Sequence, residues 1–282
     1  MNTVSVIGAG TMGAGIAQVS ALAGYSVLLY DVADEVLAQS LDGIRTSIEK
    51  GVARGKTEPT VAEAAKQAIQ TTTSLETAAQ ADLIIEAAPE KLALKREIFA
   101  TLDAAAPAHA IFGSNTSSLS INALAGAVNR ADRFLGVHFF NPAHIMKLVE
   151  LIRGDFTSDE TVTAVQEYIA KLGKTAVLCK DTPAFIVNRV ARPFYGEAFR
   201  LLGENAADPA TIDKLMRSIG FRMGPFELID LIGCDVNLSV TQSVYDAYFQ
   251  EPKYRPHPIQ KRMVESGRLG RKTGHGFYEY ET

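Results

Sequence analysis

The sequence has few cysteines, no long apolar run and no excess of positive charge, and each shortage excludes a class of protein. Its two cysteines, Cys179 and Cys234, lie far apart and form no pair with metal-ligand spacing, so we expect no metal site and reduced thiols in a cytoplasmic protein. No apolar stretch is long enough to cross a bilayer, and no secretory signal is expected. A net charge of −4 gives no reason to expect a nucleic-acid partner.

A glycine-rich turn between a short apolar strand and a helix opens the chain. Gly8 permits a sharp turn, Gly10 leaves room for a pyrophosphate beside the backbone, and Gly13 lets the helix lie close to the strand. The amides at the start of the helix favour phosphate binding. Asp31 ends the next strand about 20 residues further on, the place of the acid that holds the ribose. The Asp31 carboxylate would repel a 2′-phosphate, and Val32 and Ala33 directly after it supply no arginine to bind one, so the motif predicts NAD rather than NADP.

Periodicity predicts an α/β domain followed by a helical one. Residues 35–71 are predicted to be a helical pair that projects from the Rossmann core and is interrupted at Pro59. Further strands are predicted at residues 83–85, 110–112, 134–140, 147–152 and 176–179. From Pro183 onward the pattern is helical. We therefore expect a Rossmann-type domain with a mostly parallel sheet over residues 1–182 and an all-helical domain over 183–282.

Capping residues predict where three of the helices begin. Residues 114–118 suit the N-cap of a helix that starts near Leu119. Thr157 and Glu160 have the spacing of a capping box. Asp208 with Pro209 marks a third helix start in the second domain.

His138 lies on an apolar strand, and Glu150 lies on the strand that follows the turn at Asn141-Pro142. A single histidine on such a strand is more often a packed core residue. A hairpin, however, would bring the Glu150 carboxylate near the imidazole, where it would fix the tautomer and raise the basicity of the other nitrogen. Oxidation of an alcohol without a metal needs such a base, so the pair is our candidate catalytic centre.

At these residues the sequence resembles the L-3-hydroxyacyl-CoA dehydrogenases along nearly its whole length. The matching blocks, in order, are residues 8–13, 114–119, 138–142, 146–150, 185–189 and 270–278. It is most similar to the bacterial short forms, which include 3-hydroxybutyryl-CoA dehydrogenases and phenylacetate-pathway members that act on 3-hydroxyadipyl-CoA. Two departures affect the expected shape of the acyl pocket: Ala184 where the family often has glycine, and His144 where it often has proline.

The resemblance implies roles for individual residues. His138 would take the proton of the 3-hydroxyl, and Glu150 would orient the imidazole. Ser117 and Asn188 would hydrogen-bond the reacting oxygen, with Asn188 supplied by the helical domain across the cleft. The residues implied to bind NAD are Gly8, Gly10, Thr11, Met12, Gly13, Asp31, Glu90, Lys95, Asn115, Ser117, Asn141 and Lys272. Those implied to bind the coenzyme A thioester are Ser47, Arg54 and Lys56 on the helical pair, with Ser117 and Asn188. A homodimer formed through the helical domain is also implied.

Two other functions fit parts of this pattern. One is a related dehydrogenase of free hydroxy acids or sugar acids, which would need no coenzyme A site. The other is an NAD-binding structural or sensor protein without turnover, and such a protein would have no need of Ser117, His138, Glu150 and Asn188 together.

Overall fold

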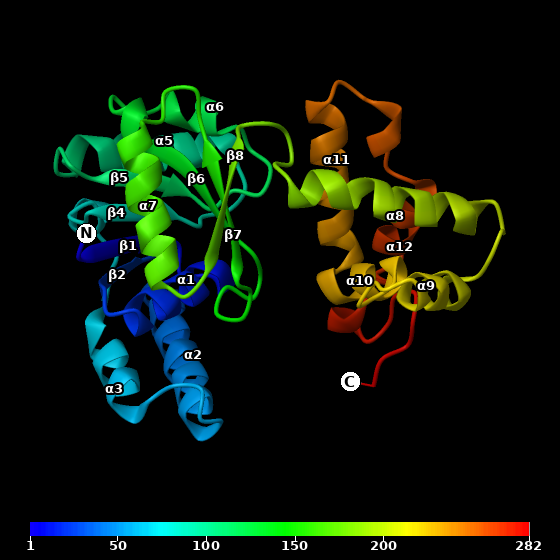
Figure 1. Cartoon of the computed structure of the whole chain (residues 1–282), viewed down its shortest axis with the longest axis horizontal. Coiled ribbons are helices and arrows are strands. Elements are labelled where there is room, and N and C mark those ends of the chain that lie inside the picture. The colour runs from blue at the N-terminus through cyan, green and yellow to red at the C-terminus, as the bar shows by residue number, and fades with distance from the viewer. Residues whose placement is uncertain (282) are drawn as a thin grey trace. The chain divides into compact units, whose positions relative to one another are not determined.

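The computed structural model describes residues 1–281 and divides the chain into two compact units, Met1–Thr182 (unit 1) and Pro183–Thr282 (unit 2) (Figure 1). Unit 1 is built on one mostly parallel sheet with helices around it, and the described part of unit 2 is helical apart from isolated bridges. The predicted fold class is therefore confirmed. Within residues 1–281, no helix has both the length and the apolar composition of a membrane span.

The sheet of unit 1 has eight strands among the described residues, in the order β3-β2-β1-β4-β5-β6-β7-β8. They are β1 (Thr3–Ile7), β2 (Ser26–Tyr30), β3 (Ile69–Thr72), β4 (Leu83–Glu86), β5 (Ile111–Ser114), β6 (Phe134–Phe139), β7 (Leu148–Arg153) and β8 (Thr175–Lys180). All neighbouring pairs are parallel except β6 and β7. The order reverses between β1 and β4, and ligands of open α/β sheets bind at the carboxyl ends of the strands at such a point.

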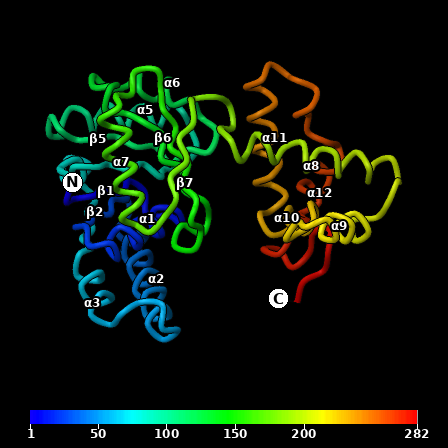
Figure 2. The backbone as a smooth tube through the Cα atoms, in the orientation of Figure 1, coloured from blue at the N-terminus to red at the C-terminus, as the bar shows by residue number. Residues whose placement is uncertain are grey.

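Helices connect the strands and pack on the sheet. In unit 1 they are α1 (Thr11–Leu22), α2 (Asp34–Ala53), α3 (Pro59–Ala68), α4 (Leu75–Ala78), α5 (Leu92–Ala105), α6 (Ile121–Ala125) and α7 (Asp159–Lys171), with the 3₁₀ turn η1 (Ala131–Arg133). Strand β4 is buried along its whole length, as expected of a strand covered on both faces. The tube in Figure 2 shows α2 and α3 side by side, extending away from the sheet as a pair.

Unit 2 has its own core, in which Phe199, Phe226 and Phe277 pack together. Its helices are α8 (Val187–Gly203), α9 (Pro209–Ser218), α10 (Pro225–Ile232), α11 (Cys234–Ala247) and α12 (Pro258–Glu265), with 3₁₀ turns η2 (Pro252–Tyr254) and η3 (Arg271–Thr273). Asp208 caps α9 by accepting from the Thr211 amide, so this predicted helix start is confirmed.

Within unit 2, the buried side chain of Asp230 on α10 holds the segment that follows α12 and η3. Its carboxylate accepts from the amides of Phe277 and Tyr278, each at 3.0 Å. It also accepts from the Tyr280 hydroxyl at 3.0 Å, and burial together with this carboxylate raises the pKa of Tyr280 to about 12. The segment around residues 276–280 is therefore anchored by one side chain that is 1% exposed.

Three local predictions were wrong. The helical pair ends at Ala68, because Ile69 is buried and residues 69–72 form the edge strand β3 beside β2. The cap before α6 is Ser120, which accepts from the Ala123 amide, since the hydroxyl run before it forms the end of β5 and a loop. Ser158 rather than Thr157 caps α7, because the Thr157 hydroxyl donates to the carbonyl of Phe134 at 2.6 Å.

Candidate active site

The glycine turn after β1 is closely packed at two of its glycines and open at the third. A Cβ on Gly13 would overlap the carbonyl oxygen of Gly8, and one on Gly8, which has φ +106°, would lie 2.8 Å from the oxygen of Ala87. A Cβ on Gly10 would meet nothing within 4 Å. The turn therefore leaves space at the start of α1, where the helix amides point, and these residues fit a dinucleotide pyrophosphate.

Asp31 follows β2 directly and lies beside this turn. Its carboxylate accepts from the amides of Ala9 and Val32, both at 2.8 Å. The acid is thus fixed against the glycine turn, and a carboxylate has further lone pairs with which to accept from ribose hydroxyls. Of the other residues predicted to contact NAD in this region, Thr11 is exposed and Met12 is half-buried.

A buried ion cluster lies at the carboxyl end of β4. The ammonium of Lys95 on α5 donates to Glu86 at 2.5 Å and to the carbonyl of Ala88 at 3.0 Å, and it pairs with Glu90 at 3.3 Å. Lys95 is 1% exposed and Glu86 is fully buried. Burial raises the pKa of Glu86, although Lys95 opposes the shift.

This cluster changes the interpretation of Lys95. Its ammonium is enclosed by the oxygens of Glu86, Ala88 and Glu90, and the contact with NAD that we predicted for it stays a prediction. The sequence prediction also missed Glu86. The signals were available: Glu86 ends an apolar strand, and Lys95 lies between Leu92 and Phe99 on the apolar face of its helix, where an unpaired charge would be too costly.

Glu90 holds the loop after β5. One carboxylate oxygen accepts from the Thr116 hydroxyl at 2.6 Å and from the Ser117 amide at 2.9 Å, and the Ser117 hydroxyl lies 3.4 Å away. Burial would raise the pKa of Glu90, but Lys95 and the hydrogen bonds outweigh it and lower the pKa below its usual value. In the same loop Asn115 accepts from the amide of Phe139 at 2.8 Å, which joins the loop to β6.

His138 and Glu150 face each other across the antiparallel pair β6 and β7. They are register partners, and His138 Nδ1 lies 2.7 Å from Glu150 Oε2. His138 is 5% exposed and Glu150 1%. When the carboxylate accepts from Nδ1–H, Nε2 becomes the basic nitrogen of the ring. Asn141 is exposed and lies in the turn that leaves β6.

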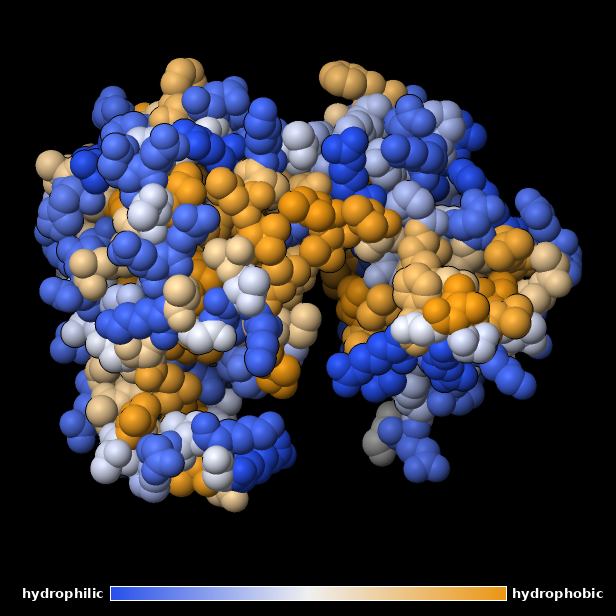
Figure 3. Space-filling model, in the orientation of Figure 1, coloured by the Kyte–Doolittle hydropathy of each residue, from blue (hydrophilic) through white to orange (hydrophobic). Residues whose placement is uncertain are grey.

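Two neighbouring cavities of unit 1 form what we call the basic groove. The larger, of about 640 Å³, contains the predicted residues Ser47, Arg54 and Lys56. The smaller, of about 410 Å³, reaches Gly10 and Thr11. The cations that line the larger cavity are Lys50, Arg54, Lys56, Lys147, Lys171 and Lys174, and no carboxylate lines it in the described chain. Figure 3 shows hydrophilic side chains gathered over the connection between α2 and α3.

Of these cations, only Arg54 and Lys56 were predicted from the sequence to bind the thioester. Lys147, Lys171 and Lys174 come from the segment before β7 and from the end of α7, which are far in sequence from α2. No periodicity relates them to Arg54 and Lys56, so only the tertiary fold brings them to one cavity.

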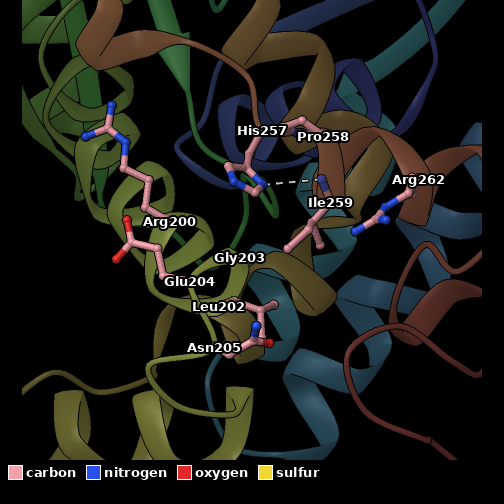
Figure 4. Close-up of a pocket in the computed structure, with 9 residues that line it drawn as sticks. All are labelled: Arg200, Leu202, Gly203, Glu204, Asn205, His257, Pro258, Ile259 and Arg262. Atoms are coloured by element: carbon pink, nitrogen blue, oxygen red, sulfur yellow. Dashed lines mark hydrogen bonds between the residues drawn. The ribbon is translucent and has the colours of Figure 1, made fainter.

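The remaining predicted residues belong to unit 2. Asn188 lies in the first turn of α8 and is half-buried. The Lys272 ammonium pairs with Asp235 at 2.6 Å. Unit 2 also has a cavity of about 460 Å³ between the end of α8 and the start of α12, where the His257 ring accepts from the Ile259 amide (Figure 4). Among residues 1–281 there is no cluster of three or more metal-ligating side chains.

Comparison with known proteins identifies the architecture. Residues 3–182 match the family model of the 3-hydroxyacyl-CoA dehydrogenase NAD binding domain, and residues 185–280 match that of the 3-hydroxyacyl-CoA dehydrogenase C-terminal domain. The chain belongs to the 3-hydroxyacyl-CoA dehydrogenase family. This family member is therefore an oxidoreductase, and its NAD-binding domain confirms the cofactor that the glycine turn and Asp31 predicted.

Relatives of this 3-hydroxyacyl-CoA dehydrogenase family member cover the whole chain. A 3-hydroxyadipyl-CoA dehydrogenase of Escherichia coli K12 is 47% identical over 281 residues, which cover 99% of this chain and 59% of that protein. The mitochondrial hydroxyacyl-coenzyme A dehydrogenase of Sus scrofa is 42% identical, with 99% and 91% covered. The crystal structure of (S)-3-hydroxybutyryl-CoA dehydrogenase from Ralstonia eutropha has a TM-score of 0.95 at 41% identity, with both chains fully covered.

Proposed function

We propose that the protein oxidises (S)-3-hydroxyacyl-CoA thioesters to 3-oxoacyl-CoA with NAD, and catalyses the reverse reaction, with short chains such as 3-hydroxybutyryl-CoA as substrates. The observation that carries the proposal is the buried His138–Glu150 pair, 2.7 Å apart. The same unit carries a glycine turn that fits a dinucleotide and a groove rich in cations. A base, a hydride acceptor and a site for a polyanionic thioester are the three parts that this reaction requires.

In the proposed mechanism His138 Nε2 takes the proton of the substrate's 3-hydroxyl as the carbonyl forms. Glu150 accepts from Nδ1–H throughout and balances the positive charge that the ring gains. The glycine turn and Asp31 would hold NAD, which would supply the acceptor for the hydride of C3. Because both side chains are buried, solvent only weakly screens the interaction of the carboxylate with the charge that develops on the ring.

Ser117 and Asn188 are proposed to donate hydrogen bonds to the reacting oxygen. Fixed donors stabilise the charge that develops on this oxygen during the reaction. The position of Ser117 is set by Glu90, which accepts from its amide. We further propose that Glu90, Asn115, Asn141 and Lys272 line the cofactor site.

The larger cavity of the basic groove, which carries the cations, is proposed to hold the coenzyme A part of the substrate. Coenzyme A carries several phosphate charges, and a protein of net charge −4 must gather cations locally to bind it. Ser47, Arg54 and Lys56 supply one wall of the groove. Binding energy from this remote group would orient the acyl chain for reaction.

A His138→Ala variant tests the proposed base. We expect kcat for 3-hydroxybutyryl-CoA to fall by about 10²- to 10⁴-fold, the usual contribution of a general base. Titration with NADH controls for folding, because the glycine turn and Asp31 remain. His109→Gln is a matched control, since His109 lies on the surface of unit 1 against Asp82. Full turnover by His138→Ala would refute the assignment.

Two alternative substrates are separated by a substrate panel. The name of the Escherichia coli relative favours 3-hydroxyadipyl-CoA, so the panel compares butyryl, hexanoyl and adipyl thioesters at equal concentrations. A free hydroxy-acid substrate is tested by comparing acetoacetyl-CoA with acetoacetate as oxidants of NADH. Equal rates with these two oxidants would refute the thioester assignment.

We also propose a homodimer formed through unit 2, in the cytoplasm. Unit 2 has exposed apolar side chains, among them Leu215, Ile219 and Leu231, which are 59%, 71% and 50% exposed. Burial raises the pKa of Cys179 to about 11 and of Cys234 to about 12, so both thiols stay protonated, as unreactive cysteines would. Sedimentation equilibrium tests the dimer, and a monomer at micromolar concentration would contradict it.

A further inference from the structure

His144 lies where the two cavities of the basic groove meet. It lines both of them, and so do Gln18 on α1 and Ser47 on α2. A molecule bound among the cations of the larger cavity therefore lies beside this imidazole. The residue is accessible rather than packed in the core.

Lys174 fixes the segment that carries His144. The Lys174 ammonium donates to the carbonyls of Ala143 and Met146 at 2.6 and 2.7 Å, so the backbone on either side of His144 is held to the turn before β8. The imidazole is therefore presented to the groove by an ordered segment.

The charges around His144 are of one sign. The other titratable groups that line the same cavity are six cations. They come from α2, the α2–α3 connection, the segment before β7, and the end of α7 with the turn after it: Lys50, Arg54, Lys56, Lys147, Lys171 and Lys174. Burial and the charge of Lys174 lower the pKa of His144. In the absence of an anion, the groove thus opposes a proton on this ring.

We propose that His144 contacts the coenzyme A part of the substrate and takes up a proton when the thioester binds. The inference rests on the proposed function, because it assumes that the polyanion in the groove is coenzyme A. Phosphate groups neutralise the surrounding cations and supply a negative partner, so both changes favour the imidazolium. Protein and ligand then bind a proton together, and linkage requires affinity to rise as pH falls.

Isothermal titration with free coenzyme A tests this proposal. Wild type and His144→Gln are titrated at about pH 6 and pH 8, each in two buffers with different heats of ionisation. The dependence of the measured heat on the buffer gives the number of protons taken up. Since the 3′-phosphate of the ligand itself titrates near pH 6, each variant is also titrated with 3′-dephospho-coenzyme A. His109→Gln is the control, because His109 does not line the groove.

Near pH 6, we expect wild type to take up a fraction of a proton more than His144→Gln on binding. Wild type and His109→Gln should take up the same number of protons. As pH falls, the Kd of wild type should decrease more steeply than the Kd of His144→Gln. The difference between the two slopes should be less than about tenfold per pH unit. If the difference persists with the dephospho ligand, the diphosphate is the partner; if it disappears, the 3′-phosphate is, and both results support the proposal. Equal uptake by wild type and His144→Gln would overturn it, whereas failure of wild type to bind coenzyme A would refute the proposed function itself.

Discussion

Replacing Lys95 with methionine would isolate the effect of the buried ion cluster. Methionine is similar in length and apolar, so the volume is retained while the charge is lost. Glu86 would keep the hydrogen bonds from the Ser114 hydroxyl at 2.7 Å and the Ala88 amide at 2.6 Å, but it would lose the ammonium at 2.5 Å. Removing one partner of a buried ion pair costs about 3–5 kcal/mol, because the other charge remains in a site without solvent.

The loss should depend on pH in a known direction. Burial already raises the pKa of Glu86, and without Lys95 the pKa rises further. The folded state then binds the proton of Glu86 more strongly than the unfolded state, so the Glu86 site favours folding at low pH, and that contribution is lost as pH rises through the folded pKa. Lys95→Met should therefore be closest to wild type at low pH and furthest from it at high pH. The double variant Glu86→Gln/Lys95→Met should recover much of the lost stability at high pH, since neither of these two buried positions then carries a charge.

Hydrogen exchange measured by mass spectrometry reads the effect locally, in peptides covering residues 83–95 and 111–118. Local opening should become easier by about 100- to 4,000-fold near neutral pH, as 3–5 kcal/mol implies. The Kd for NADH should rise in parallel, because Glu90 loses its cation. Protection equal to that of wild type at high pH, or a double variant no better than the single one, would refute the reasoning.

Four further variants test other contacts. Gly10→Ala should retain stability but weaken NADH binding, whereas Gly13→Ala should lower the melting temperature, since its Cβ overlaps the turn; calorimetry and fluorescence titration separate the two, and equal stability would contradict the packing argument. Asp31→Ala should weaken NADH binding by about 10- to 100-fold through loss of charged hydrogen bonds, with less effect on NADPH; a parallel loss for both cofactors would argue against ribose recognition. Asp230→Ala should release residues 276–280 to exchange and cost about 3 kcal/mol or more for three lost hydrogen bonds, and unchanged protection there would contradict the anchoring role.

The parts of the site that are local in sequence were predictable. The glycine turn and Asp31 lie within one strand–helix–strand unit, where spacing determines structure. His138 and Glu150 lie on strands joined by a short connection, so alternation along each strand is enough to suggest that they face each other.

Contacts between distant segments were not predictable in this way. The pairing of Glu86 with Lys95 depends on how α5 packs against β4, and the lysines of the basic groove come from elements with no common period. Edge strand β3 was missed because only Ile69 is buried, and alanine-rich helical sequence precedes it. Local pattern identifies elements, but the charges that meet between elements are set by the tertiary fold.

The antiparallel pairing of β6 and β7 makes the proposed base and its partner a module of their own. Backbone hydrogen bonds of the ladder fix the register of His138 and Glu150, so the pair does not depend on the segment that joins the two strands. Residues 140–147, which carry Asn141 and His144, can accept substitutions or insertions while the two side chains stay opposite each other. Evolution, or an engineer, can therefore change this segment without rebuilding the His138–Glu150 pair.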